Sequence, residues 1–363
     1  MSLPPSHRII IINAKILAAT KTMALCYRKG ELYTLDYVNW KMLPLCRLPM
    51  SSKNRMLSKC RLTERLLRLE PRTACVLDDE NIIFSFQGCV YRINLRNGRL
   101  VKEMEFRPGM NNPLSFVVLK GLVGFEDSVL FGEYFSNNSY EEVKVWQRIN
   151  GDWKAVMALP AGSLYHIHAI VPDYKNECLY ILTGDNDNES AILKVTDNFK
   201  TVTPILKGSQ QFRSCVAFPY NDGLVYATDT PREINHVYYT HPNKSGWSVD
   251  SICELPGPGI YGICQNKAFY FATSVEADDT LPAYRYRFSY KLGAGVKERV
   301  SHVVKIDQKL SSTNVLGLKK DIWPMLLFQF GNCWFPVCER KDLLMICPTA
   351  VKRYDGKTII IEL

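Results

Sequence analysis

The sequence contains no C-x-x-C pair, and its twelve cysteines are scattered over 363 residues. This spacing excludes the zinc-finger type of structural metal site. Cys26, Cys89, Cys178 and Cys215 lie within apolar, strand-like runs. We therefore expect buried free thiols, which are typical of a reducing compartment.

Signatures of several enzyme classes are also missing. The sequence has no G-x-S-x-G nucleophile elbow, no G-x-x-x-x-G-K phosphate loop and no H-E-x-x-H helix. The apolar run "IIIINAKILAA" is interrupted by Asn13 and Lys15, so it is too short to span a bilayer and predicts a first strand. We expect a cytoplasmic protein without a membrane span; the alternative is a secreted or periplasmic protein whose signal peptide is missing from this sequence.

The charge is unbalanced towards the positive side. A net charge of +9 suits an anionic ligand, although it also serves solubility. Much of it lies in Ser51–Arg72, where Leu62, Leu66 and Leu69 predict one amphipathic helix with a solvated basic face. Zinc-finger spacing, basic-zipper heptads and RNA-binding aromatic signatures do not accompany it, so no nucleic-acid partner is expected.

A strand-rich unit recurs along the chain without a Gly/Ser linker between copies. Six apolar segments begin 44 to 57 residues apart, and an earlier copy begins 50 residues before the first of them. We interpret each as the second strand of a four-stranded unit. These segments are "ELYTLD" from Glu31, "NIIFSF" from Asn81, "SVLFGE" from Ser128, "CLYILT" from Cys178, "LVYATD" from Leu224, "AFYFAT" from Ala268 and "MLLFQF" from Met325.

A period near 50 with about four strands per period is typical of a β-propeller. The sequence therefore predicts an all-β chain that forms a single propeller of antiparallel blades. We favour seven blades; six remain open if the two ends of the chain share one blade, because closure removes exposed sheet edges. The blades are expected at approximately 1–50, 73–107, 113–160, 164–206, 212–256, 258–310 and 321–363, with 51–72 as a basic helical insertion.

Propeller topology predicts where a site would form. The loop that enters each innermost strand and the loop that leaves each second strand open on the same face, so their residues meet around one channel mouth. The entering loops carry Arg72, Asn111, Asn112, His166, His168, Arg213, Tyr261 and Trp323. The leaving loops carry Glu133, Asp185, Asp187, Asp229 and Glu276.

Two of only six histidines, His166 and His168, occur in "YHIHAIV". Strand alternation places both on one face, about 7 Å apart along the strand. The pair suits either a divalent metal completed by a carboxylate such as Asp185, or a general base beside a binding residue. A hydrogen-bonded histidine between blades is the structural alternative. We expect that the protein requires no cofactor; the one optional cofactor that the residues suggest is a divalent metal ion.

The remaining polar residues receive roles in saccharide chemistry. The candidate catalytic residues are His166, His168, Asp185, Asp229 and Glu133, because paired carboxylates serve glycoside chemistry. Arg213 is a candidate clamp for an anion, with an ion pair to Asp229 as the alternative. The expected substrate-binding residues are Arg213, Arg72, Gln211, Tyr261, Trp323 and Glu276.

The segments "FGEY" at Phe131–Tyr134, "HIHAIVPD" at His166–Asp173 and "TGDNDNE" at Thr183–Glu189 resemble the sialidase-like, Asp-box (BNR-repeat) propellers, especially glycan-associated bacterial members. The degenerate box "VTDNFKTV" keeps Asp197 and Thr201 of S-x-D-x-G-x-T-W. The resemblance implies a propeller architecture more than an activity, since "FRPG" lacks the isoleucine of the Arg-Ile-Pro motif of sialidases.

These observations predict a propeller that binds an anionic saccharide at one channel mouth. If it is an enzyme, we expect a glycoside hydrolase or a lyase that acts on this saccharide. The alternative is a non-catalytic propeller whose rim binds a protein partner. The identity of the sugar, turnover and the oligomeric state are left open by the sequence.

Overall fold

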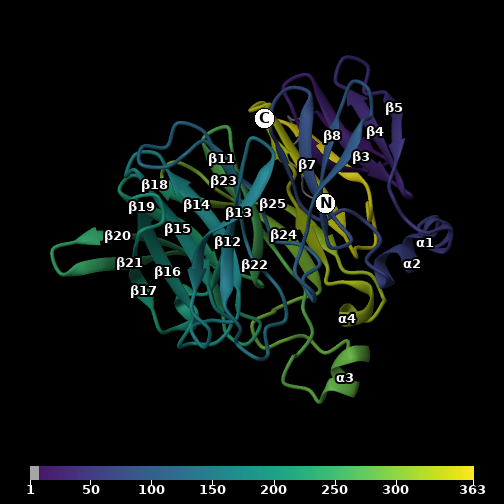
Figure 1. Cartoon of the computed structure of the whole chain (residues 1–363). Helices are drawn as coiled ribbons and strands as arrows, with labels where there is room; N and C mark the ends of the chain where they lie inside the picture. Colours follow the sequence, from purple (N-terminus) through teal and green to yellow (C-terminus); the bar gives the residue numbers. More distant parts are fainter. Residues whose placement is uncertain (1–7) are drawn as a thin grey trace.

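The protein is described here over residues 8–363 of a computed structural model. Seven sheets radiate from a common axis, and each contains four antiparallel strands that run from an innermost to an outermost position (Figure 1). This arrangement confirms the predicted all-β, seven-bladed propeller and excludes the six-bladed alternative.

The strands of blades 1 to 4 are numbered here from the axis outward. They are β2 (Lys15–Ala19), β3 (Met23–Arg28), β4 (Glu31–Asp36) and β5 (Met42–Arg47); β6 (Ala74–Val76), β7 (Asn81–Phe86), β8 (Cys89–Asn94) and β9 (Leu100–Glu105); β10 (Val117–Leu119), β11 (Ser128–Gly132), β12 (Val143–Ile149) and β13 (Asp152–Leu159); β14 (Ile167–Asp173), β15 (Cys178–Thr183), β16 (Ala191–Thr196) and β17 (Thr201–Lys207).

Blades 5 to 7 follow the same order. They are β18 (Ser214–Tyr220), β19 (Gly223–Thr228), β20 (Asn235–Asn243) and β21 (Gly246–Leu255); β22 (Gly259–Gln265), β23 (Ala268–Thr273), β24 (Val300–Ile306) and β25 (Ser312–Lys319); β26 (Asn332–Trp334), β28 (Leu343–Thr349), β29 (Thr358–Glu362) and β1 (Ile9–Ile12).

The two ends of the chain close the ring. β1 pairs antiparallel with β29, with Ile10 opposite Ile360, so the N-terminal strand is the outermost strand of the last blade. A two-residue strand, β27 (Val337–Cys338), also crosses to blade 1 and pairs parallel with β2. The β27–β2 pairing links the last blade to the first by backbone hydrogen bonds and pairs β2 on both sides, whereas β1 is the outer edge of blade 7.

The core lies between the faces of neighbouring blades. Every residue of the second strands β15, β19 and β23 is buried. A strand that is covered on both faces needs apolar residues at consecutive positions, and this explains why these segments read as continuous apolar runs rather than alternating ones. The recurrence in the sequence is therefore a direct consequence of blade packing.

Two of the seven segments interpreted as second strands were assigned to the wrong element. "ELYTLD" forms β4, the third strand of blade 1, and "MLLFQF" contains the helical turn α4 (Met325–Phe328). The true second strand of blade 7 is the fully buried β28. Pro324 precedes α4 and begins the turn, a context that the apolar pattern alone does not distinguish from a strand.

The basic insertion also differs from its prediction. It forms two short helices, α1 (Ser52–Leu57) and α2 (Arg61–Leu66), instead of one. Its basic residues divide: Lys53 and Lys59 are exposed as predicted, whereas Arg65 is 2% exposed and pairs with Asp321 and Asp355. Partly buried carboxylates that flank the strands of blade 7 therefore help to determine how α2 packs.

The other helical segments are the 3-10 turn η1 (Gln210–Phe212) and α3 (Ala283–Phe288). Helix α3 projects beyond the blades near α4 (Figure 1). Within residues 8–363, no helix combines the length and the apolar character needed to cross a membrane.

Candidate functional site

A cavity of about 630 Å³, called the first cavity below, opens where the inner strands begin. Aromatic side chains and unlike polar groups line it together, which is typical of sites for polar organic ligands. Its lining includes Arg72, Tyr134, His166, Asp185, Tyr261 and Gln329.

His166 lines this cavity, and an irregularity in β14 brings His168 against it. Its pairing with β15 shifts between Ile167 and Ala169, so that His168 occupies a bulge. A bulge re-aims the side chain that it carries. The two imidazoles therefore converge, with their Nε2 atoms 2.9 Å apart, instead of standing about 7 Å apart along the strand.

Backbone carbonyls determine which imidazole nitrogen carries the proton. His166 Nδ1 lies 3.2 Å from the carbonyl oxygen of Phe135, and His168 Nδ1 lies 3.0 Å from that of Ser214. Because a carbonyl oxygen can only accept, both Nδ1 atoms donate, and each neutral ring presents a lone pair at Nε2. Two such lone pairs at 2.9 Å repel unless a proton or a cation lies between them.

Asp185 completes this cluster. Its carboxylate oxygens lie 3.5 Å from His166 Nε2 and 3.4 Å from His168 Nε2. Burial raises the pKa of Asp185, but interaction with the two histidines outweighs it and holds the pKa well below the usual range. Burial lowers the pKa of His166, so this ring tends to be neutral. The low pKa of Asp185 requires positive charge at the two Nε2 atoms, so the cluster is favourable when a proton or a cation lies among these three groups.

Arg213 lies behind the cluster. Its Nη2 is 3.0 Å from Asp185 Oδ1 and 3.7 Å from Asp229 Oδ2, and its Nη1 donates to the Asp185 carbonyl. Burial lowers the pKa of Arg213, but Asp229 and Asp185 raise it by more, so the guanidinium stays charged. It is shared between two carboxylates, and this limits its capacity to clamp an anionic ligand.

Two triplets of side chains among the described residues have the spacing of metal ligands. The first is His166, His168 and Asp185; the second is His168, Cys215 and Asp229. In the second, burial and Asp229 raise the pKa of Cys215, whose thiol donates to Asp229 at 3.1 Å. A protonated thiol is a poor ligand, so the first triplet is the better donor set.

Four further predicted residues lie in or near the same region. Arg72 and Tyr261 line the first cavity. No hydrogen bond or ion pair joins the Arg72 guanidinium to another residue within 8–363. Asp229 and Glu276 lie beyond Arg213; Glu276 accepts a hydrogen bond from Ser274, and burial together with Asp229 raises its pKa to about 8.

Other predicted residues are not brought to the cavity. The Glu133 carboxylate accepts hydrogen bonds from the Lys144 amide at 3.0 Å and from the Trp146 indole at 3.1 Å, and it pairs with Arg107. Trp323 is 40% exposed and packs on Phe328, outside the lining.

Gln211 also lies elsewhere. It belongs to η1 and faces a different pocket, where its carbonyl oxygen accepts from the Tyr226 hydroxyl. The loop rule locates the mouth of the channel but not the direction of each side chain.

Sequence reasoning missed Tyr134 and Gln329. Tyr134 follows Glu133, and its ring centroid lies 4.1 Å from that of His166. Gln329 is 6% exposed, and neither its amide nitrogen nor its amide oxygen has a partner among the described residues. Its backbone has φ +71° and ψ 151°, a conformation that costs non-glycine residues of the order of 1–3 kcal/mol. Nothing in "MLLFQF" signals this conformation.

Comparisons with known proteins support the propeller fold but do not assign the chain to a family. No protein-family model matches the chain, and no curated protein matches it, so the BNR-repeat and sialidase relationship is not shown. The crystal structure of oligogalacturonate lyase from Vibrio parahaemolyticus is 10% identical, covers 98% of this chain and 91% of its own, and has a TM-score of 0.57. A chain of a mitotic checkpoint complex is 7% identical, covers 100% and 94%, and has a TM-score of 0.53. At these identities the likeness is one of fold alone.

Proposed function

We propose that the first cavity binds an anionic saccharide. The observation that carries this proposal is the His166–His168–Asp185 cluster, which adjoins the unpaired donors of Arg72 and Gln329. A guanidinium without an ion pair matches a carboxylate, an unpaired amide matches a hydroxyl group, and Tyr261 offers a flat face to a sugar ring. The fold neighbour named as an oligogalacturonate lyase agrees with this substrate class.

We further propose that a divalent cation occupies the histidine cluster. Two nitrogens at tetrahedral angles and 2.0–2.1 Å from a metal are separated by about 3.3 Å, which is close to the 2.9 Å between the two Nε2 atoms. The Nδ1 bonds to carbonyls fix the ring orientation, as they do around metal-bound histidines. Bound there, the cation would act as a Lewis acid towards a substrate carboxylate. Where neither a cation nor a shared proton engages its Nε2, the neutral His166 ring would take the role of general base.

The arrangement supports elimination better than hydrolysis. A glycosidase needs two available carboxyl groups across the scissile bond. Asp185 is engaged by the histidines and Arg213, whereas Glu133 is saturated with donors. Elimination needs one base: the base takes the proton of the C–H bond next to the carboxylate, a C=C bond forms, and the glycosidic C–O bond breaks as its oxygen takes up a proton from water.

The test combines metal analysis with ligand-induced thermal shifts in a panel of uronic acids, sialic acids and their oligomers. A ligand at about 100 times its Kd should stabilise the protein by roughly 2.7 kcal/mol. We expect H166A and H168A to lose bound metal and R72Q to bind the saccharide at least ~10-fold more weakly. H241A and R99Q are the matched controls. Unchanged saccharide binding in all three cavity variants would overturn the proposal.

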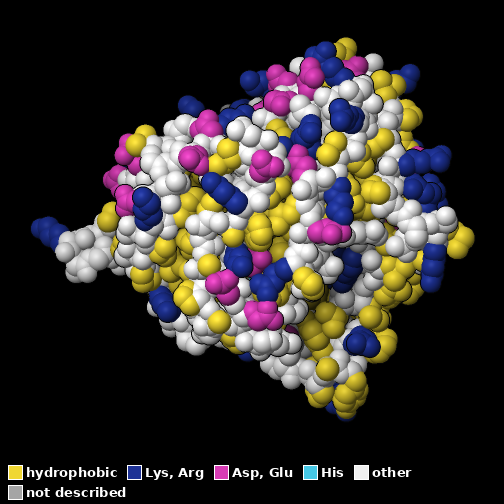
Figure 2. Space-filling model, viewed as in Figure 1, with side chains coloured by type: hydrophobic (Ala, Val, Ile, Leu, Met, Phe, Trp, Pro, Cys, Tyr) yellow, Lys and Arg dark blue, Asp and Glu magenta, His cyan; other side chains and the backbone are white. Residues whose placement is uncertain are grey.

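An interaction propeller remains the second candidate, because α3 and the loop before α4 carry exposed apolar side chains. Tyr284, Phe288 and Ile322 are 68%, 60% and 69% exposed. Hydrophobic side chains gather at this projecting tip (Figure 2). This function would be favoured over saccharide binding by two results together: no thermal shift with any saccharide of the panel, and loss of a bound protein partner in the variant Y284S/F288S.

A further inference from the structure

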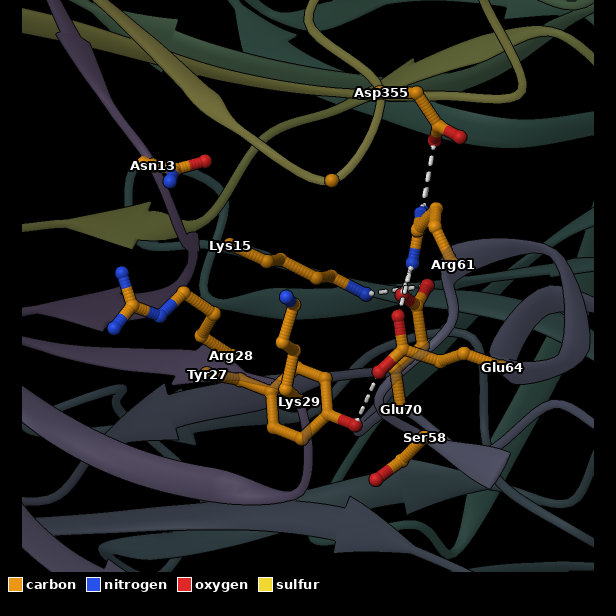
Figure 3. Close-up of a pocket in the computed structure, with 11 residues that line it drawn as sticks. Asn13, Lys15, Tyr27, Arg28, Lys29, Ser58, Arg61, Glu64, Glu70 and Asp355 are labelled. Carbon is orange, nitrogen blue, oxygen red and sulfur yellow. Dashed lines mark hydrogen bonds and ion pairs between the residues drawn. The ribbon is translucent and has the colours of Figure 1, made fainter. Parts of the chain in front are cut away.

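A second cavity, of about 420 Å³, adjoins the first, and Figure 3 shows the residues that line it. It is bounded by the start of β2, the end of β3, the helical insertion and the turn before β29. Its charged lining includes Lys15, Arg28, Lys29 and Arg61. Lys15 and Glu70 line both cavities, so these two side chains form part of the wall between them.

The carboxylates of Glu64 and Glu70 are fully engaged. Glu64 accepts from the Tyr27 hydroxyl at 2.6 Å and from Arg61 Nη1 at 2.8 Å, one bond to each oxygen. Glu70 accepts from Lys15 Nζ at 3.3 Å through one oxygen and from Arg61 through the other. Neither residue leaves a carboxylate oxygen without a donor.

Asp355, the third acidic residue of the lining, is engaged in the same way. Its Oδ1 accepts from Arg61 Nη2 at 2.9 Å and from the Ala350 amide at 3.0 Å, while its Oδ2 accepts from Arg65 Nη1 at 3.1 Å. Internal cations therefore already compensate the negative charge on this wall. A cationic ligand would have to displace Arg61 or Arg65 to reach it.

Two cationic side chains on the other wall have no carboxylate partner. The Arg28 guanidinium lies over the Tyr33 ring, with 5.2 Å between its central carbon and the ring centroid. Within residues 8–363, neither Arg28 nor Lys29 forms an ion pair. Figure 3 shows Arg28 and Asn13 on the side opposite Arg61 and Asp355, with the Lys29 amine turned towards Lys15. The spare groups of this cavity are thus mostly donors.

We propose that the second cavity binds a small oxyanion, the phosphate or carboxylate group of a ligand, through Arg28 and Lys29. An oxyanion supplies the acceptors that the cavity lacks. The guanidinium can bind two of its oxygens while the ammonium neutralises the remaining charge. This site does not depend on saccharide binding in the first cavity.

Isothermal titration calorimetry with inorganic phosphate tests the proposal at an ionic strength held constant with sodium chloride; acetate supplies the carboxylate arm. We expect saturable binding of at least one anion by the wild type and a loss of at least ~10-fold in R28Q/K29Q. K21Q/K41Q removes two exposed charges from the same blade and should bind as the wild type does. R72Q, in the first cavity, should also leave this binding unchanged.

Phosphate binding alone identifies a phosphate site, and acetate binding alone a carboxylate site; both outcomes support the proposal if R28Q/K29Q abolishes them. Wild-type affinity in R28Q/K29Q overturns it, as does loss of binding in R72Q but not in R28Q/K29Q. Absence of saturable binding of either anion also overturns it. Circular dichroism of each variant checks that the fold is retained.

Discussion

The two cavities lie on one face of the propeller and share Lys15 and Glu70, yet their charge balance differs. In the second cavity, Arg61 contacts three carboxylates, and the groups left over are donors. In the first, the Nε2 atoms of two imidazoles and the Asp185 carboxylate lie within 3.5 Å of one another, and Arg213 contacts the carboxylate from behind. The first cluster therefore requires a positive charge, while the second cavity accepts a negative one.

This difference separates groups that stabilise the fold from groups that remain available to a ligand. A buried carboxylate with donors on both oxygens is part of the structure, and removing its partner is costly. A buried amide or imidazole without a partner lowers stability until a ligand satisfies it. The following predictions test this distinction.

The largest effect is expected from R61M in the second cavity. This change leaves Glu64, Glu70 and Asp355 without their common cation, and Glu70 is only 3% exposed. Removing one partner of a buried ion pair destabilises a protein by about 3–5 kcal/mol. Urea unfolding measures the loss. R340M breaks the exposed pair with Asp342 and should cost less than ~1 kcal/mol; equal costs for the two variants would remove the distinction.

A pH-dependent effect is expected from Glu276, behind the first cavity. Burial and Asp229 raise its pKa to about 8, so the folded state keeps a proton that the unfolded state has lost above about pH 4.3. The stabilisation is fully present below about pH 4.3 and is lost as pH rises through 8. Wild-type stability should therefore fall relative to E276Q, by up to about 1.4 kcal/mol per pH unit.

Thermal or urea unfolding of both proteins at pH 5 to 9 measures this difference. E126Q, at an exposed position, is the control for the loss of one carboxylate. A constant difference between E276Q and the wild type across this range would show that Glu276 is ionised throughout.

The smallest effect on stability is expected from Q329G. Glycine adopts φ +71° readily and removes a buried amide without partners, so the variant should be about 1 kcal/mol more stable. The same change should weaken saccharide binding in the first cavity. Unfolding and thermal-shift titration measure the two effects; a variant that binds the panel as the wild type does would show that Gln329 makes no ligand contact.

Much of the fold could be predicted because blade packing leaves a strong local pattern. β15, β19 and β23 are apolar at nearly every position, since neighbouring blades cover both of their faces. The pattern failed at Met325, where an equally apolar run forms the helical turn α4 after Pro324. Hydrophobicity reports burial, whereas backbone conformation at such a turn depends on what packs around it.

The sequence predicted where in the fold the site lies but not how its side chains are arranged. The loop rule brought His166, His168, Asp185, Arg213 and Asp229 to one region, and their contacts are now described. It could not show that Glu133 turns away towards Trp146. Adjacent residues of an extended segment face opposite sides, so an uncertainty of one position reverses the direction of a side chain.

The sequence by itself determined the blade repeat, the free cysteines and the rarity of histidine, because these are properties of composition and local periodicity. Only the tertiary structure decided that a bulge brings two Nε2 atoms to 2.9 Å, that Arg61 and Arg65 are consumed by carboxylates distant in sequence, and that Gln329 is left unpaired. Each of these depends on contacts between segments that are distant in the chain, which a local pattern does not encode.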